Sequence, residues 1–313
     1  MADRDSVSKE TAQSANSAAA ATPLARQLES EKQRREKLKA KRMPEPDQTR
    51  IITISNQKGG VGKTTTTVNL STAMARAGMN VLVIDMDPQG NASTALNIPH
   101  PPGTPSIYNV LIEDEDLKEV VYDNPETDGL LVAPSTIDLA GAEIELVSLV
   151  AREQRLTRAI NSYSQFREQQ GLPRLDYIFI DCPPSLGLLT VNAFVAAGEV
   201  LIPIQTEYYA LEGLSQLVKN IEMIQQHLNP TLHISTILLT MYDARTNLAV
   251  QVAEEVREYF PDQVLSAVIP RNVRISEAPS YQQSVLTYDP SSTGALSYRE
   301  AAMEIAERGV SSS

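Results

Sequence analysis

The sequence of 313 residues contains no tryptophan and a single cysteine, Cys182. One thiol excludes an intramolecular disulfide and the zinc or iron–sulfur sites that take several cysteines from one chain. The chain also lacks any apolar run close to the roughly 20 residues of a membrane-spanning helix, and it is polar from Met1 onward, so we expect neither a transmembrane helix nor a secretory signal. Together these absences favour a cytoplasmic protein in a reducing environment.

Basic residues are scarce over most of the chain. The formal net charge is −12, but residues 1–50 hold 11 Lys and Arg against 8 Asp and Glu, whereas the remainder holds 16 against 31. Such an acidic body repels nucleic-acid phosphates at long range. Contact with DNA would therefore require a local basic patch or the N-terminal segment.

Residues 1–48 have the composition of an arm rather than of a packed domain. Residues 1–22 show no apolar periodicity, and such segments cannot bury enough surface to offset chain entropy, so we expect disorder there. From Leu24 to Arg42 helix formers dominate, with seven Lys and Arg in residues 32–42. Two interpretations stay open: a solvated, partly helical arm, and a basic arm that contacts DNA or a partner protein.

Residues 49–313 form one predicted domain in which short apolar runs alternate with longer helical patterns. The runs are rich in Val, Ile and Leu, which suits strands covered on both faces. They lie at residues 51–55, 81–85, 129–134, 176–181, 199–204 and 234–240. The alternation predicts an α/β fold with a doubly wound, mostly parallel sheet and helices on both faces.

A glycine-rich segment, KGGVGKTT from Lys58 to Thr65, follows the first apolar run and precedes a helical pattern. It matches the P-loop pattern except that Gln57 stands where the strict form has Gly. Glycines let the backbone wrap around phosphates, and the positive end of the next helix faces them. The predicted nucleotide ligands are Gly59, Gly60, Val61, Gly62, Lys63, Thr64 and Thr65.

Two side chains of this loop have distinct expected roles. Lys63 would neutralise the charge of the β- and γ-phosphates, and the Thr64 hydroxyl would ligate Mg²⁺. The predicted cofactors are therefore ATP and Mg²⁺.

Three carboxylates follow apolar runs. Asp181 ends a run whose neighbour we expect to be the P-loop strand, which would place its carboxylate to hold Mg²⁺ through water. Asp85 and Asp87 are two residues apart and would point the same way, near the terminal phosphate if their strand adjoins the first. A strand-end carboxylate can also be a structural cap, and that alternative stays open for Asp181 and Asp85.

These motifs resemble those of the ParA/MinD group of ATPases with a deviant Walker A motif, in which a second lysine stands where Lys58 stands here. The resemblance covers most of residues 50–308. It is carried by VLVIDMDPQGNAS, DYIFIDCPPSLG, LLTMYDARTNL and IPRNVRISEAPSY, which begin at Val81, Asp176, Leu238 and Ile269. These segments look like the chromosomal, Soj-like branch of ParA.

The resemblance implies a catalytic set of Lys58, Lys63 and Asp87. Lys58 would reach across a nucleotide-sandwich dimer to the partner's ATP, and Asp87 would orient the attacking water. Asp85 would support the water shell of the metal, giving a predicted metal set of Thr64, Asp85 and Asp181.

Further positions follow from the same resemblance. Residues 88–91 and 183–187 would border the γ-phosphate and change their order with the bound nucleotide. Pro270 and Asn272 would lie beside the adenine.

Three arginines of the acidic body, Arg245, Arg271 and Arg274, are the predicted DNA-binding residues. In the resembling ATPases, positions matching Arg245 and Arg274 belong to a surface that binds DNA without sequence preference and that dimerisation completes. The alternative is that these arginines pair with local carboxylates such as Asp243 or Glu277.

The resemblance implies an ATP-dependent switch in chromosome or plasmid partitioning. The expected partners are a second copy of the chain in the ATP state, non-specific double-stranded DNA and a ParB-type centromere-binding protein that stimulates hydrolysis, which would place the protein on the nucleoid. A Min-type ATPase that positions a cargo without DNA is the main alternative. Membrane recruitment is not expected, because the C-terminal segment has few large apolar residues.

Overall fold

The computed structural model describes residues 23–208 and 210–310, which fall into two units that meet between Arg42 and Met43. The first unit contains α2 (Pro23–Lys39), which overlaps the segment from Leu24 to Arg42 in which helix formers predict a partly helical arm. The predicted disorder of residues 1–22 lies outside the described residues. This division lies before residue 48, where the sequence predicts the end of the arm, and Met43, the first residue of the second unit, is buried.

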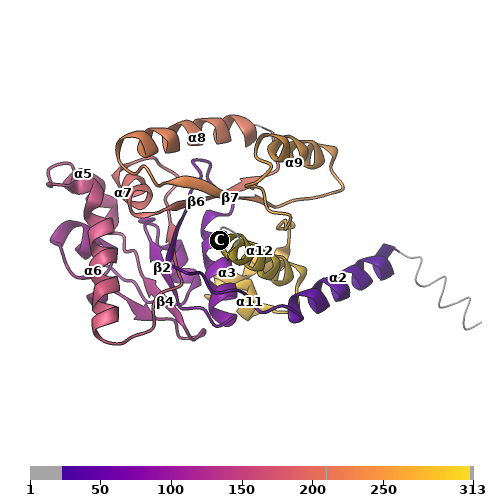
Figure 1. The fold of residues 1–313 in the computed structure, drawn as a ribbon, viewed down its shortest axis with the longest axis horizontal. Coiled ribbons are helices and arrows are strands. Elements are labelled where there is room, and N and C mark those ends of the chain that lie inside the picture. The colour runs from indigo at the N-terminus through magenta and orange to yellow at the C-terminus, as the bar shows by residue number, and fades with distance from the viewer. Residues whose placement is uncertain (1–22, 209, 311–313) are drawn as a thin grey trace, which may run out of the picture. The chain divides into compact units, whose positions relative to one another are not determined.

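A seven-stranded sheet forms the centre of the second unit, in the order β3-β4-β2-β5-β1-β6-β7 (Figure 1). The strands are β1 (Arg50–Ile54), β2 (Val81–Asp85), β3 (Tyr122–Asp123), β4 (Leu130–Ala133), β5 (Tyr177–Asp181), β6 (Glu199–Gln205) and β7 (His233–Thr240). Every pairing is parallel except that of β3 with β4. The predicted doubly wound, mostly parallel sheet is confirmed, and all six predicted runs are strands.

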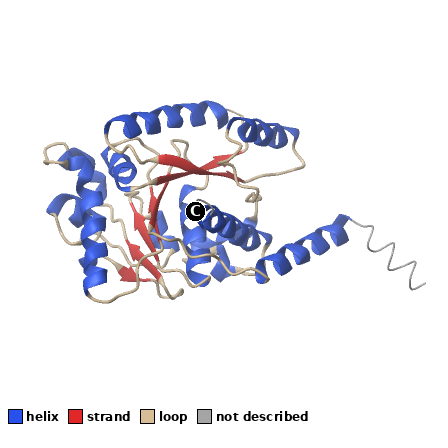
Figure 2. Cartoon of the chain, in the orientation of Figure 1, coloured by secondary structure: helices blue, strands red, loops and turns tan. Residues whose placement is uncertain are grey.

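Helices and short helical turns connect these strands (Figure 2). The α-helices after α2 are α3 (Lys63–Arg76), α4 (Asn91–Ala95), α5 (Leu139–Leu146), α6 (Arg155–Gln169), α7 (Leu188–Ala196), α8 (Ala210–His227), α9 (Asn247–Tyr259), α10 (Val273–Glu277), α11 (Val285–Tyr288) and α12 (Thr293–Val310). The short turns are η1 (Asn109–Glu113), η2 (Leu117–Glu119), η3 (Arg152–Gln154) and η4 (Ala278–Tyr281). Within the described residues, no helix is long and apolar enough to cross a membrane.

The two faces of the sheet carry separate helical layers. Alternate strand residues such as Leu82 and Ile84 of β2 face α5, α6 and α7, while residues of β6 and β7 on the same side pack against α8 and α9. Helices α3 and α12 pack together on the other side (Figure 1). The sheet is therefore covered on both faces, as its uninterrupted apolar strands require.

The strand order decides which loops meet at the carboxyl edge of the sheet. β1 lies between β5 and β6, and β5 lies between β1 and β2. Asp181 therefore ends a strand next to the P-loop strand, as predicted, whereas the strand of Asp85 is one place further away. In such sheets ligands bind outside the carboxyl ends of the strands where the order reverses, which here is at β1.

Candidate functional site

The loop between β1 and α3 has the backbone shape of an anion cradle. Gly60 and Gly62 have φ angles of 75° and 91°, in the left-handed region that side chains with a Cβ rarely adopt. Gly62 immediately precedes α3, whose first backbone N–H groups have no partner within the helix. Such a helix start attracts phosphate through its free N–H groups and its dipole.

Two polar residues that the sequence patterns did not single out hold this loop. Thr240, at the end of β7, donates from Oγ1 to the carbonyl of Val61 at 2.8 Å. Asn56 donates to the carbonyl of Pro203 at 2.8 Å and accepts from the backbone N–H of Lys58 at 3.0 Å. The contacts of Thr240 with Val61 and of Asn56 with Pro203 join segments far apart in sequence, so no local spacing marks them.

A cavity of about 400 Å³ opens over the loop. Its described lining residues are Gly59, Gly60, Gly62, Lys63, Thr64, Thr65, Val68, Asn69, Asp87, Asn91, Thr94, Ala95, Pro184, Met241, Ala278, Pro279 and Gln283. The structure thus brings six of the seven predicted loop ligands together with Asp87 and with one residue of each predicted switch segment. Val61 is the exception, because its side chain is buried and only its backbone belongs to the loop.

Lys63 supplies the positive charge of this cavity. Its side chain is 7% exposed, and its Nζ donates to the carbonyl of Lys58 at 3.3 Å. Burial lowers the pKa of Lys63, while the charges of Asp181 and Asp87 oppose that shift. Since burying a cation without a close counterion is costly, an anion in the cavity would be stabilised strongly.

Asp181 lies fully buried beneath the start of α3 and is held by two hydroxyls. Thr64 Oγ1 donates to Oδ2 at 2.7 Å, and Thr67 Oγ1 donates to Oδ1 at 2.9 Å. Burial and the nearby charge of Asp85 raise the pKa of Asp181. Hydroxyl and carboxylate oxygens next to a phosphate cradle are the donor set that Mg²⁺ takes when phosphate and water complete its shell.

Asp85 and Asp87 differ in their surroundings. Asp85 is fully buried: its carboxylate accepts from the backbone N–H of Asp87 at 3.1 Å, and from the backbone N–H and hydroxyl of Ser93 at 2.9 and 2.7 Å. It is not among the described lining residues of the cavity, and these hydrogen bonds brace the loop that carries Asp87; its role in supporting the metal stays a prediction. Asp87 lines the cavity and accepts from the N–H of Gln89 at 3.0 Å.

The side chain of Lys58 makes a contact outside the group of cavity-lining residues. Its Nζ lies 3.1 Å from Oε2 of Glu207, in the loop after β6, and both side chains are partly exposed. Among the described lining residues of the cavity Lys58 is absent. Its ammonium therefore pairs with Glu207 and does not line this cavity of its own chain.

The structure does not bring the predicted adenine residues to the cavity. Pro270 pairs with Tyr242 in an isolated bridge, and the side chain of Asn272 caps α10 by accepting from the N–H of Arg274 at 2.8 Å. Neither Pro270 nor Asn272 is among the described lining residues, and Met241, Ala278, Pro279 and Gln283 form this wall, so the place of the two residues beside the adenine stays a prediction. Asn69 of α3 anchors this wall, because its Oδ1 accepts from the backbone N–H of Val285 at 2.8 Å.

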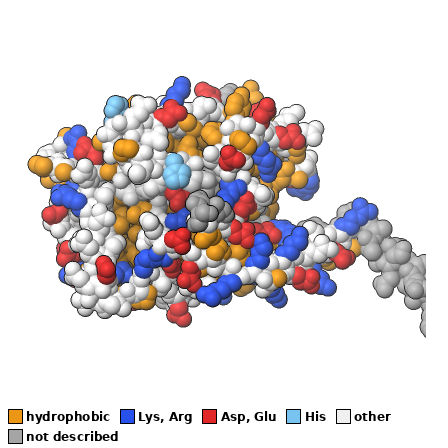
Figure 3. Space-filling view, in the orientation of Figure 1, with side chains coloured by type: hydrophobic (Ala, Val, Ile, Leu, Met, Phe, Trp, Pro, Cys, Tyr) orange, Lys and Arg blue, Asp and Glu red, His pale blue; other side chains and the backbone are white. Residues whose placement is uncertain are grey.

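The predicted DNA-binding arginines lie on the surface, and two of them pair with local carboxylates. Arg245 contacts Asp243 at 2.7 Å, and its charge and hydrogen bonds lower the pKa of Asp243 to about 2. Arg274 contacts Glu277 at 3.0 Å and Asp289 at 3.5 Å. On the face in Figure 3, acidic and basic side chains are interspersed over the second unit. In the single chain, the alternative of local pairing is therefore the observed arrangement for these two.

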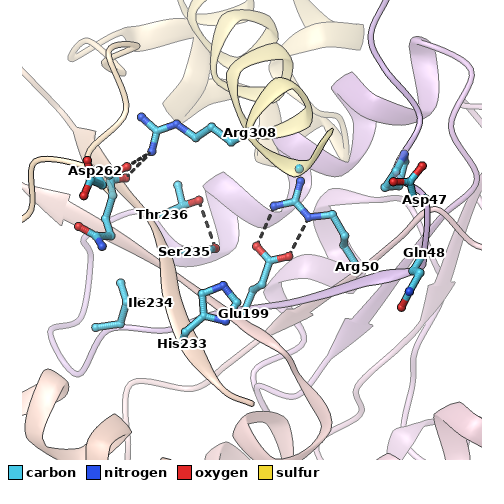
Figure 4. A pocket seen from close by; sticks show the side chains of 13 residues that line it. Asp47, Gln48, Arg50, Glu199, His233, Ile234, Ser235, Thr236, Asp262 and Arg308 are labelled. Carbon is cyan, nitrogen blue, oxygen red and sulfur yellow. Dashed lines mark hydrogen bonds and ion pairs between the residues drawn. The ribbon is translucent and has the colours of Figure 1, made fainter. Parts of the chain in front are cut away.

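A second cavity, of about 540 Å³, lies at the opposite, amino edge of the sheet (Figure 4). Arg50 and Glu199, at the starts of β1 and β6, form a bidentate pair there, with both N–O distances at 2.7 Å. Arg308 donates to the backbone carbonyls of Asp262 and Gln263. The arginines of this cavity are thus engaged by Glu199 and by backbone carbonyls, and the P-loop cavity is the better candidate site.

Comparison with known proteins agrees with this geometry. A family model described as an AAA domain matches residues 49–234. The chain is 52% identical over 260 residues to the sporulation initiation inhibitor protein Soj of Bacillus subtilis (strain 168), covering 83% of this chain and 99% of that protein. It is 51% identical over 259 residues to the chromosome partitioning protein ParA of Myxococcus xanthus (strain DK1622), covering 83% and 88%.

A solved structure extends the comparison to three dimensions. The crystal structure of a cobyrinic acid a,c-diamide synthase from Mycobacterium smegmatis with bound ADP and magnesium matches with a TM-score of 0.68 and 35% identity, covering 81% of this chain and 92% of that one. The fold, the P-loop cavity and the close sequence relatives lead to one assignment. The chain belongs to the ParA/Soj family of chromosome-partitioning ATPases.

Proposed function

We propose that this protein is a MgATP-dependent dimerisation switch, in which ATP closes a homodimer and its hydrolysis to ADP and phosphate reopens it. The proposal rests on one observation: the side chains of two lysines of one loop lie in different places. Lys63 points into the cavity, whereas Lys58 lies beside Glu207 outside it. A cation at that position is free to enter a second copy's site and neutralise phosphate charge there, which makes the nucleotide the link between two chains.

Within one chain, each side chain has a distinct task. The loop glycines and the start of α3 bind the phosphates, and Lys63 neutralises them. Thr64 and Asp181 would hold Mg²⁺, which when bound neutralises charge on the β- and γ-phosphate oxygens. Asp87 would orient the attacking water, and its position at the cavity wall supports that role.

The dimer would bind double-stranded DNA without sequence preference, and a ParB-type protein would stimulate hydrolysis and so release it. The cations proposed for DNA are Arg245, Arg271 and Arg274. Because two of them have carboxylate partners in the single chain, DNA phosphates must compete for them, which predicts weak, salt-sensitive binding. Such binding would hold the protein on the nucleoid.

The pairing of Arg245 and Arg274 also favours a second candidate, a Min-type switch that positions a protein cargo without DNA. The two candidates share the ATP-dependent dimer and differ in whether the dimer retains DNA.

Light scattering coupled to size exclusion tests the proposal. The Asp87→Ala variant, which should trap ATP, is run with and without MgATP and then with a DNA fragment. We expect a monomer without nucleotide, a dimer with MgATP and co-elution of DNA with the dimer alone. A monomer at saturating MgATP would overturn the switch, and a dimer without DNA would select the second candidate.

A further inference from the structure

Thr67 takes part in the site without touching the cavity. It lies on α3, fully buried, and its Oγ1 is 2.9 Å from Oδ1 of Asp181 and 3.1 Å from the carbonyl of Lys63. Thr64 contacts the other oxygen of the same carboxylate at 2.7 Å. The two hydroxyls therefore hold Asp181 from both of its oxygens.

The Thr67 hydroxyl has one hydrogen and two acceptors within reach. A hydrogen bond to a carboxylate is roughly twice as strong as one to a neutral carbonyl, so the hydrogen goes to Asp181 whenever that group is ionised. Oδ1 is buried and, among the described residues, Thr67 is its one side-chain donor, so losing this hydroxyl would leave the oxygen of the ionised group unsatisfied. The bond also fixes the rotation of the carboxylate about its last torsion.

We propose that Thr67 is a positioning residue for Asp181: it holds Oδ1 so that Oδ2 stays directed at Thr64 and at the cation that accompanies the nucleotide. The inference rests on the proposed function, because it takes MgATP as the occupant of the cavity. Groups that orient a metal-binding carboxylate affect metal affinity although they do not touch the ion. Thr67 meets that description, since it contacts Asp181 and does not line the cavity.

The same helix offers a matched control. Thr72 is also buried, and its Oγ1 donates to a carbonyl of its own helix, that of Val68, at 2.7 Å. Replacing either threonine by valine removes one hydroxyl from the buried part of α3 at nearly constant volume. Only the change at position 67 removes a contact with Asp181.

The test titrates free Mg²⁺ against the full chain and measures binding of a fluorescent ATP analogue, with a parallel titration in EDTA. For Thr67→Val we expect the half-saturating Mg²⁺ concentration to rise by about tenfold, with binding in EDTA unchanged. Thr67→Ser keeps the hydroxyl and should restore the Mg²⁺ dependence, and Thr72→Val should match the unmodified chain.

An unchanged Mg²⁺ midpoint in a folded Thr67→Val protein overturns the inference, as does an equal shift in Thr72→Val. If Thr67→Val does not fold, Thr67→Cys, with a weak S–H donor, replaces it, and a Mg²⁺ midpoint that does not rise would again overturn the inference. Failure of the proposed function looks different: the unmodified chain would then bind no ATP analogue with Mg²⁺ present.

Discussion

Lys58 and Lys63 belong to one loop, yet the Nζ of Lys58 lies 3.1 Å from Oε2 of Glu207 while the Nζ of Lys63 lies 3.3 Å from the carbonyl of Lys58. The Lys58–Glu207 pair is nearly half exposed, at 43% and 44%. Exposed pairs contribute about 0–1 kcal/mol, so Lys58 can leave Glu207 at little cost when a stronger anion is offered.

Replacing each of the two lysines by alanine should therefore impair a different property of the protein. Lys63→Ala removes the buried cation of the cavity and should weaken ATP binding by at least about 100-fold, since charge-assisted phosphate contacts are among the strongest in proteins. Lys58→Ala should bind ATP within about twofold of the unmodified chain, a difference below about 0.5 kcal/mol, yet form no dimer. Equilibrium binding and light scattering measure the two properties separately. Normal ATP dimers of the Lys58→Ala chain would contradict the assignment.

Substitutions of the two neighbouring carboxylates, Asp85 and Asp87, should also have different effects. Asp87→Ala should retain ATP and slow phosphate release by about 100-fold or more, because water positioning contributes at that scale. Its thermal stability should change little, since the N–H that loses its acceptor belongs to Gln89, which is exposed to water. Asp85→Ala is the contrasting variant: it leaves the N–H groups of Asp87 and Ser93 without their acceptor and should cost about 1–3 kcal/mol of unfolding free energy. Equal loss of stability in both variants would contradict this division.

The Arg50–Glu199 pair at the amino edge of the sheet should make stability depend on pH. Burial alone would raise the pKa of Glu199, but hydrogen bonds from Arg50 and its charge outweigh burial and lower it. A carboxylate with a lowered folded pKa contributes stability above its unfolded pKa, about 4.3, and loses it as the pH falls through the folded value. Both side chains are only 13% exposed, so Arg50→Met, which leaves this charge unpaired, should cost about 3–5 kcal/mol at pH 7.

That loss should shrink as the pH falls below about 5, because Glu199 becomes protonated first in the variant, where Arg50 no longer opposes the effect of burial on its pKa. Denaturant unfolding at pH 7 and pH 4 measures the difference. Arg152→Met is the control, since Arg152 pairs with Glu153 at the surface and should contribute about 0–1 kcal/mol at most. A penalty for Arg50→Met that stays constant with pH would contradict the pairing argument.

DNA binding should respond in opposite directions to changes at the Arg274–Glu277 pair. Arg274→Glu should reduce the amount of DNA that the ATP-bound dimer retains. It should also lower the slope of log DNA affinity against log salt concentration by about 1 for each arginine lost. Glu277→Gln removes a competitor for Arg274, which it contacts at 3.0 Å, and should raise the affinity. Both are measured across salt concentrations in the Asp87→Ala background. Unaltered retention in the Arg274→Glu dimer would remove Arg274 from the DNA surface.

Much of the fold follows from local pattern. The strand runs are uninterrupted stretches of Val, Ile and Leu, and the glycine-rich loop lies between a strand and a helix, so both were predictable from sequence. β3 escaped prediction, because its two residues are too short to show a pattern. The order of the strands was not accessible either, since it depends on pairing between distant segments.

The positions of individual side chains were harder to predict for the same reason. The two-residue spacing of Asp85 and Asp87 suggested a shared direction, but the strand ends at Asp85 and the turn that follows sends Asp87 to the cavity while Asp85 bonds to Ser93. Pro270 and Asn272, predicted from resemblance, are not among the described lining residues of the cavity, whereas Ala278 and Pro279 of the same segment are.

By itself the sequence determined the strands, the glycine-rich loop and which lysines, hydroxyls and carboxylates are candidates to serve it, because these depend on short-range pattern and chemistry. Only the tertiary structure decided that β5 separates the strand of Asp85 from that of the loop, that Lys58 turns to Glu207, and that Thr67 reaches Asp181. Each of these joins residues that only folding brings together, and their contacts depend on the packing of whole elements rather than on neighbours along the chain.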